Sequence, residues 1–183
     1  MNVKRYWLAQ RMEENMFEIT TPINDETISN LEIGNIIYVS GYIFCGRDAV
    51  LPKVINELNN GNIELLEMLK GGVIFHTAVS PAGVGPTSSN KLEIESSMKT
   101  LSEFGIKMHL GKGAIKKDTV KDLNENNSVF AVMPPVTALL GAKTTERECI
   151  AFPELGMEAL YRIKVDKYPV IIGAAHGRSI YDE

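Results

Sequence analysis

Between Ile36 and Met133 the sequence alternates between short apolar runs rich in β-branched residues and stretches whose apolar residues recur every three or four positions. The first pattern is typical of buried strands, and the second of helices packed by one face. The expected strands are Ile36–Phe44, Val73–Val79, Ile106–Leu110 and Ser128–Met133, and the expected helices are Asp48–Leu58, Asn90 to about Gly105 and Lys116–Leu123. Because strands separated by helices tend to pair in parallel, we expect the α/β class, layered around a partly parallel core sheet.

Further strand-like segments toward both ends of the chain suggest a second β layer. They are Met16–Thr21, Cys149–Phe152 and Tyr161–Ala174. Pro169 has no N–H for a ladder hydrogen bond and therefore predicts an edge or a bulge in the last of them. Short helices are expected near Asp25–Leu31 and at Pro134 and Pro135, which suit the first turn of a helix that Gly141 interrupts or ends.

The composition is that of a globular protein able to bury a core. Hydrophobic residues make up 44% and charged residues 23% of the 183 positions, and a chain of this size buries roughly 70% of the surface that its unfolded form exposes. We expect one domain, residues 1–183. No run approaches the roughly 18 apolar residues of a membrane span, and charges interrupt the first 16 positions, unlike in a secretory signal. The sequence therefore predicts a cytoplasmic protein without membrane contact.

The charged, thiol and imidazole groups narrow the kinds of partner. A net charge of −4 disfavours nucleic acid, because a protein that binds the phosphate backbone needs a basic face. Cys45 and Cys149 lack a CxxC spacing, so we expect two reduced thiols in or near the core. His76 lies in an apolar run and indicates a core histidine whose hydrogen bonds are satisfied, whereas His109 and His176 are as consistent with surface groups as with ligands. Neither the two cysteines nor the three histidines have the spacing of metal ligands, so no metal site is expected in this chain.

The segment 82–91 (AGVGPTSSNK) is the most informative candidate site, because it joins an expected strand to an expected helix. Asn90 and Glu93 form a capping-box pattern at the start of that helix. Backbone N–H groups at a helix N-terminus attract anions, and the hydroxyls of Thr87 and Ser88 can donate hydrogen bonds to carboxylate oxygens. The alternative is a well-capped loop that binds no ligand.

Two more strand-to-helix junctions carry cations. Arg47 has the planar guanidinium that grips a carboxylate through two parallel hydrogen bonds; the alternative is that Asp48 caps the next helix and Arg47 is a solvated surface charge. Lys112 lies between two glycines after a strand, a pattern also typical of a turn with an exposed lysine. All three junctions are expected along one edge of a parallel sheet, where α/β proteins build ligand sites. Together with Lys91 they suit a small dicarboxylate.

The segment Pro153–Glu158 (PELGME) carries two carboxylates, Glu154 and Glu158. Both could face the candidate site. The alternative is an acidic patch that faces a partner or solvent, which is the more common use of exposed glutamates.

Six segments resemble, in order and spacing, the β subunit or C-terminal region of class I fumarases and L-tartrate dehydratases. They are Ile19–Ile23 (ITTPI), Leu31–Gly41 (LEIGNIIYVSG), Gly46–Ala49 (GRDA), Gly85–Glu93 (GPTSSNKLE), Gly111–Gly113 (GKG) and Phe152–Tyr161 (FPELGMEALY). The GRDA motif alone carries little information. The succession of GPT[TS], GKG and PELGMEA is specific, and the resemblance covers almost the whole chain.

The resemblance implies a swivelling β/β/α domain and a 4Fe-4S cluster whose free iron takes the hydroxyl and carboxylate of the substrate. Such a cluster needs three cysteine ligands, and this chain has two in unrelated places. The cluster is therefore expected in a separate α subunit, as in the split members of the family. An α2β2 assembly is the family's expectation for the complex.

The resemblance also implies roles for individual residues. Arg47 would bind a substrate carboxylate, Thr87 would be the base that removes the proton beside that carboxylate, and Lys112 would add a positive contact. Lys91 stands where the family usually has arginine, so the bidentate fork is lost there. Leu51 and Pro52 stand where the family tends to have a histidine, and these departures bear on the choice of substrate more than on the class of reaction.

The function expected from the resemblance is the reversible hydration of fumarate to malate by a hydro-lyase that is active only with its α subunit. Dehydration of L-tartrate is the alternative within the same chemistry. From a different class, the chain could be a non-catalytic module of the same fold that binds dicarboxylates.

Overall fold

The structure is a computed structural model that describes residues 16–81, 83–88, 91–133 and 137–182. Its strands are β1 (Met16–Thr20), β2 (Ile36–Cys45), β3 (Val73–Phe75), β4 (Thr77–Ser80), β5 (Gly83–Thr87), β6 (Met108–Gly111), β7 (Val129–Val132), β8 (Thr144–Ala151), β9 (Leu160–Ala175) and β10 (Arg178–Ser179). Its helices are α2 (Asp25–Ser29), α3 (Leu51–Asn59), α4 (Ile63–Leu69), α5 (Lys91–Glu103), α6 (Lys117–Glu125), α7 (Thr137–Ala142) and the 3₁₀ segment η1 (Pro153–Glu158).

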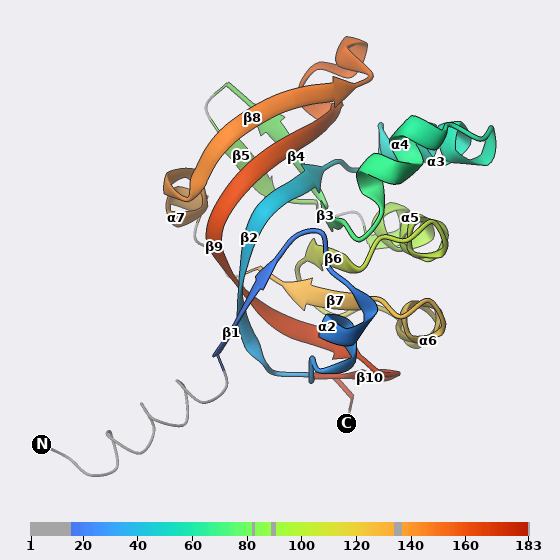
Figure 1. The fold of residues 1–183 in the computed structure, drawn as a ribbon, viewed down its shortest axis with the longest axis vertical. Helices are drawn as coiled ribbons and strands as arrows, with labels where there is room; N and C mark the ends of the chain where they lie inside the picture. The colour runs from blue at the N-terminus through green and yellow to red at the C-terminus, as the bar shows by residue number, and fades with distance from the viewer. Residues whose placement is uncertain (1–15, 82, 89–90, 134–136, 183) are drawn as a thin grey trace, which may run out of the picture.

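The central sheet is partly parallel and closes on itself through a pairing of β9 with β2. Strands β2, β3, β6 and β7 run parallel, neighbour to neighbour, and the long strand β9 pairs antiparallel with both β7 and β2. Strand β1 extends the sheet beside β2, and β8 extends it beside β9. Figure 1 shows the strongly curved sheet that results, with α3, α4, α5 and α6 along one side. The predicted α/β class and the partly parallel core sheet are confirmed.

The segment after β3 differs from the prediction. The expected strand Val73–Val79 is divided at His76 into β3 and β4, and the expected loop forms β5, which pairs with β4 in a two-stranded hairpin. The pairing Val79↔Val84 buries two apolar side chains, and the Thr77 hydroxyl donates a 2.7 Å hydrogen bond to the Gly85 carbonyl. The glycines therefore belong to a strand that accepts close backbone approach rather than to an irregular loop.

The β8 strand begins earlier than expected, at Thr144 instead of Cys149. Its first half is polar and exposed on the outer side of β9, so it lacks the apolar run that marks a buried strand. Cys149 is exposed on this strand, whereas Cys45 is fully buried. The expectation of a thiol in or near the core is therefore right for Cys45 and wrong for Cys149.

The core fills both faces of the central strands. Along β3, the side chains of Val73 and Phe75 belong to the cluster inside the curved sheet, while Ile74 belongs to the cluster under the helices, with Leu51 and Leu101. Strands buried on both faces are apolar without alternation. This explains why Val73–Phe75 appears in the sequence as an uninterrupted apolar run.

Pro169 lies within β9, opposite Tyr38 of β2. The stretch of β9 before it, residues 160–165, pairs with β8, and the stretch after it, residues 171–174, pairs with β7. The residue without an N–H therefore stands at the change from one neighbour to the other, where a ladder is least disturbed by its absence.

Gly41 bends β2 where the register against β9 shifts. Its φ is +103°, and a Cβ there would lie 2.5 Å from the Thr21 hydroxyl, which itself donates a 2.6 Å hydrogen bond to the Tyr42 carbonyl. We expect Gly41→Ala to lower the free energy of unfolding by about 2–4 kcal/mol, through backbone strain plus the clash. Gly61→Ala is the control, because Gly61 has a φ of +82° and nothing within 4 Å of the added Cβ. Equal losses in urea denaturation would contradict the steric part of this explanation.

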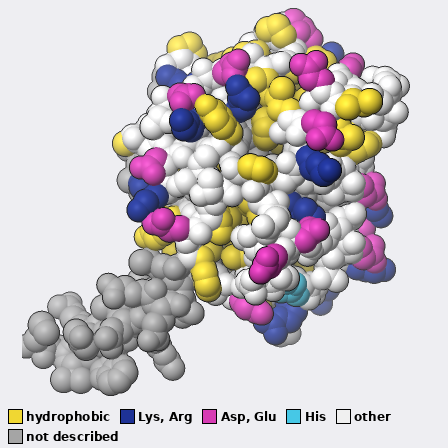
Figure 2. All heavy atoms as spheres, viewed as in Figure 1, with side chains coloured by type: hydrophobic (Ala, Val, Ile, Leu, Met, Phe, Trp, Pro, Cys, Tyr) yellow, Lys and Arg dark blue, Asp and Glu magenta, His cyan; other side chains and the backbone are white. Residues whose placement is uncertain are grey.

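The outer surface carries charges of both signs. Figure 2 shows Lys and Arg side chains interspersed with Asp and Glu on the face in view. Several are cross-strand pairs, such as Lys164–Glu146 at 3.0 Å and Arg162–Glu148 at 2.6 Å between β9 and β8. In the part of the chain that the structure describes, no helix is long and apolar enough to cross a membrane. The expected lack of nucleic-acid and membrane partners stays a prediction.

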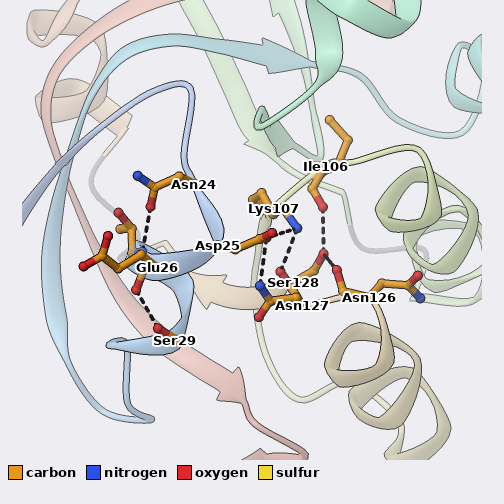
Figure 3. A network of polar contacts seen from close by, with 10 residues as sticks. Asn24, Asp25, Glu26, Ser29, Ile106, Lys107, Asn126, Asn127 and Ser128 are labelled. Atoms are coloured by element: carbon orange, nitrogen blue, oxygen red, sulfur yellow. Dashed lines mark hydrogen bonds and ion pairs between the residues drawn. The ribbon is translucent and has the colours of Figure 1, made fainter.

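A polar network joins α2 to the turn before β7 (Figure 3). The Lys107 ammonium lies 2.6 Å from an Asp25 carboxylate oxygen, and the Asn127 amide donates a 2.8 Å hydrogen bond to the same oxygen. Asn127 has a φ of +50°, and the next residue, Ser128, donates a 2.7 Å hydrogen bond to the Ile106 carbonyl. The hydrogen bond from Lys107, followed by that from Asn127, holds the pKa of Asp25 below its usual value.

This network predicts a pH-dependent stability difference between the wild type and Asp25→Asn. Because the pKa of Asp25 is lowered by folding, its contribution is present above the unfolded pKa of about 3.9 and is lost as the pH falls through the folded pKa. The gap in unfolding free energy, measured by urea denaturation at each pH, is expected to be largest above about pH 5 and to close at lower pH. A gap that stays constant down to acid pH would contradict the assignment.

Candidate functional site

The carboxyl ends of the parallel strands meet at one edge of the sheet. Backbone hydrogen bonds continue the ladder past the strand ends: Gly46 N–H donates to the Phe75 carbonyl at 3.1 Å, and His76 N–H donates to the Leu110 carbonyl at 3.1 Å. The residue before Gly46 ends β2, and Gly111 ends β6. The prediction is therefore confirmed for the junctions that carry Arg47 and Lys112, whereas the segment before α5 follows β5 of the separate antiparallel hairpin.

The β4–β5 hairpin brings Thr87 and Ser88 to this edge. Thr87 pairs with Thr77 at the end of the hairpin, and the Ser88 N–H donates a 2.9 Å hydrogen bond to the His76 carbonyl. Ser88 is buried, while Thr87 is partly exposed. The hairpin thus fixes the backbone of both residues between the end of β3 and the start of α5.

A pocket of about 80 Å³ joins two of the predicted site residues. Its lining consists of Ser88, Ile94, Glu95, Met98, Gly111, Lys112, Ala114, Ile115 and Phe130. A Cβ on Gly111 would lie 2.9 Å from the Phe130 ring, so the absence of a side chain in the GKG turn lets the aromatic ring pack beside the pocket. Ser88 and Lys112 therefore line one cavity, together with mostly apolar side chains and Glu95.

Glu95 is a pocket residue that the sequence does not single out. It is buried, and its carboxylate accepts a 2.9 Å hydrogen bond from the Lys116 N–H and a further, short one from the Thr119 hydroxyl. These donors lie at the start of α6, so the glutamate serves as the cap of a neighbouring helix, where a negative charge is favoured. Its position two residues after the expected capping glutamate, Glu93, gives no sequence signal for this role.

Arg47 does not line the pocket and instead forms an ion pair with Glu158 of η1. Its Nε donates to Glu158 Oε1 at 2.5 Å, and its Nη2 contacts the same oxygen. Both side chains are about one third exposed. The alternative in which Asp48 caps the next helix is wrong, because α3 begins at Leu51 with Val50 as its N-cap and without a side-chain cap. The Arg47 side chain is therefore fixed by an ion pair rather than being a solvated surface charge.

The remaining predicted residues are only partly described. The backbone of α5 begins at Lys91, but the Lys91 side chain lies outside the described part of the chain, as do Asn90 and the Glu93 side chain of the expected capping box. Pro134 and Pro135 are also outside it. Lys112 is exposed at the mouth of the pocket.

Two histidines form a buried chain beneath the site. His76 Nε2 lies 3.2 Å from His109 Nδ1, and His109 Nε2 lies 3.0 Å from the Ser102 hydroxyl. Burial lowers the pKa of His76 to about 3, and burial together with the neighbouring His76 lowers the pKa of His109 well below its usual value. The prediction of a core histidine is thus confirmed for His76, but the expectation that its hydrogen bonds are satisfied is wrong for Nδ1, which has no partner among the described residues. His109 is buried too, whereas His176 is exposed and lies 2.8 Å from the Leu31 carbonyl.

Comparison with known proteins assigns the family. Residues 2–183 match the family model described as Fumarase C-terminus. The chain belongs to this family. The match spans the positions of Arg47, Thr87, Lys112 and Glu158, and it confirms the resemblance found in the sequence.

The relatives are of two lengths. A putative L(+)-tartrate dehydratase subunit beta from Methanocaldococcus jannaschii is 29% identical over 176 residues, 88% of this chain and 89% of the relative. The L(+)-tartrate dehydratase subunit beta of Escherichia coli K12 is 28% identical, covering 90% and 86%. A putative class I fumarate hydratase from Geobacillus stearothermophilus is 24% identical over 93% of this chain but only 34% of the relative. The chain spans nearly all of the β subunits and about a third of the longer fumarate hydratase.

The thiols of this Fumarase C-terminus chain do not fit a 4Fe-4S cluster. Cys45 is fully buried in the core, where burial raises the pKa of its thiol, and Cys149 is exposed on β8. Two cysteines in different environments cannot supply the three thiolates that a cluster with one open iron takes. Within residues 16–81, 83–88, 91–133 and 137–182, no three His, Cys, Asp or Glu side chains gather closely enough to hold a metal ion.

Proposed function

We propose that the chain is the β subunit of a two-subunit iron–sulfur hydro-lyase that hydrates fumarate reversibly to L-malate and is active only with a cluster-bearing α subunit. The observation that carries the proposal is the edge of the parallel sheet, where Arg47, the Thr87–Ser88 segment and Lys112 follow successive strands or the hairpin between them. Membership of the Fumarase C-terminus family supports the assignment of a hydro-lyase site to this edge.

Recognition of a dicarboxylate would come from groups at this edge. Arg47 would bind one carboxylate through its planar fork. Ser88 and Lys112, which share the pocket beside α5, would contact carboxylate oxygens through a hydroxyl and an ammonium. Lys91 would add a point charge at the start of α5, without the two-pronged geometry of an arginine.

Thr87 would move the proton. In the dehydration direction its oxygen, deprotonated beforehand to the alkoxide, would take the proton from the carbon beside the bound carboxylate and become the neutral hydroxyl. The electron pair of that C–H bond would form the double bond, and the neighbouring C–O bond would break with its electrons leaving on hydroxide. Negative charge develops on the carboxylate as the proton leaves, so Arg47 and Lys112 would stabilise the transition state if they are already in place. A threonine hydroxyl needs such cations and a helix N-terminus nearby to act as a base.

The partner would supply what this chain lacks. The 4Fe-4S cluster would reside on the α subunit and would bind the hydroxyl and one carboxylate of the substrate. We place the complex in the cytoplasm as an α2β2 assembly, with residues 1–183 as one swivelling β/β/α domain that brings its substrate-binding edge against the cluster.

Dehydration of L-tartrate is the second candidate. One observation favours it: the relatives whose length matches this chain carry the name tartrate dehydratase subunit beta. Tartrate differs from malate by one further hydroxyl, so a polar group of the pocket that hydrogen-bonds this hydroxyl would favour it.

The test is anaerobic co-expression with a candidate α subunit, followed by cluster reconstitution and separate assays with fumarate and L-tartrate. Copurification of the two chains with hydration of fumarate supports the first reaction, and dehydration of tartrate alone supports the second. An assembled, cluster-loaded complex that acts on neither substrate would overturn the enzyme function and leave the non-catalytic dicarboxylate-binding module.

A further inference from the structure

We propose that Glu158 is a positioning residue, which holds the Arg47 guanidinium so that its free edge faces a substrate carboxylate. The inference rests on the proposed function of Arg47 and adds a residue from a distant segment. Glu158 lies at the end of η1, 111 positions from Arg47 in the chain.

The contacts divide the guanidinium into two edges. Glu158 Oε1 accepts from Nε and from Nη2, which is the side edge of the planar group. An arginine has five N–H donors in a fixed fork, so one Nη1–H and one Nη2–H remain on the end edge. Among the described residues, no hydrogen bond or ion pair involves Nη1. The end edge has the geometry that receives a carboxylate through two parallel bonds.

Both partners of the ion pair are anchored by the core. Cys45 pairs with Tyr161 in the β2–β9 ladder, so the chain leaving β2 and the chain entering β9 lie side by side. Gly46 packs within 3.4 Å, measured from an added Cβ, of the Leu160 side chain, which is fully buried. The carboxylate and the guanidinium therefore project from fixed backbone beside each other, with about one third of each side chain exposed to a ligand.

Two effects of Glu158 on anion binding have opposite signs. Its negative charge repels a substrate carboxylate, whereas its hydrogen bonds remove rotamer freedom that a free arginine would lose on binding. If charge dominated, Glu158→Gln would tighten substrate binding. We expect the opposite, because a positioned fork is required at the carboxylate where charge develops.

The experiment is steady-state kinetics of the reconstituted complex. Glu158→Ala is expected to lower kcat/KM by about 10- to 100-fold, and Glu158→Gln, which keeps one oxygen acceptor, by about 3- to 10-fold with a raised KM. In the Arg47→Ala background, Glu158→Ala is expected to have little further effect, because the group that it positions is gone. Glu154→Ala is the matched control on η1, since its carboxylate lies 3.9 Å from Lys53 and is largely exposed; it should leave kcat/KM unchanged.

Additive losses in the double variant, or a lowered KM in Glu158→Gln, would overturn the inference while leaving the proposed function intact. If the wild-type complex is inactive on both substrates, the proposed function fails and the inference is judged on the full chain by NMR of the arginine Nε–H groups, with succinate as the probe. A succinate-dependent shift of the Arg47 signal that Glu158→Ala abolishes supports it. A shift of equal size in the variant, or none in the wild type, overturns it.

Discussion

Replacing Thr87 by alanine is expected to lower kcat of the reconstituted complex by about 100- to 10,000-fold, the range over which a positioned general base contributes to rate. The hydroxyl is the group proposed to take the proton, and the hairpin pairing with Thr77 keeps the backbone of residue 87 in place when the side chain is shortened. The measurement is the rate of fumarate or tartrate turnover at saturating substrate, with copurification of both subunits as the check on assembly.

Thr87→Ser is the control, because it retains the hydroxyl and loses one methyl group. We expect it to keep a substantial part of the activity. A Thr87→Ala complex that turns over substrate within about tenfold of the wild-type rate would mean that another group takes the proton, and Thr87 would then be a binding residue at most.

The largest expected loss of stability follows from Phe75→Ala, at about 3–5 kcal/mol. Phe75 is 1% exposed and belongs to the cluster inside the curved sheet. Truncation of its side chain therefore leaves a cavity that the hydrogen-bonded strands around it cannot fill. Its carbonyl also accepts the Gly46 N–H beside Arg47, but this backbone contact is unaffected by the side chain. The folded Phe75→Ala variant should therefore retain dicarboxylate binding at temperatures well below the midpoint of its thermal unfolding.

Urea denaturation of the full chain measures this loss. Phe75→Leu keeps most of the apolar volume and is expected to cost about 1–2 kcal/mol. Ile63→Ala, at a side chain that is 71% exposed at the start of α4, should change the unfolding free energy by no more than about 0.5 kcal/mol. A loss for Phe75→Ala as small as that for Ile63→Ala would contradict the placement of Phe75 in the core.

The sequence alone predicts the elements whose patterns are local. Strands β2, β6 and β7 and helices α3, α5 and α6 follow from apolar spacing, and the edge that collects Arg47, Ser88 and Lys112 follows from strand–helix alternation. The β4–β5 hairpin does not follow, because Gly83 and Gly85 are typical of loops. They belong to a strand only because Gly83 pairs with Ser80 and the Gly85 carbonyl accepts a hydrogen bond from Thr77.

The contacts of the site depend on long-range pairing that no local pattern contains. Glu158 meets Arg47 because β2 and β9 pair across 116 positions, from Cys45 to Tyr161. His109 is buried beside His76 because β3 and β6 are neighbours, although its own segment does not distinguish a surface histidine from a buried one. The closure of the sheet through β9 is therefore what converts the separate motifs into one arrangement.

The central claim is that this chain completes an active site that it shares with an α subunit. The most direct measurement is to titrate the chain anaerobically into a fixed amount of cluster-loaded α subunit and to follow fumarate and L-tartrate turnover. We predict no turnover with either chain alone and a rise that saturates once the α subunit is fully bound. Full activity of the α subunit without this chain, or a saturated complex inert toward both substrates, would contradict the claim.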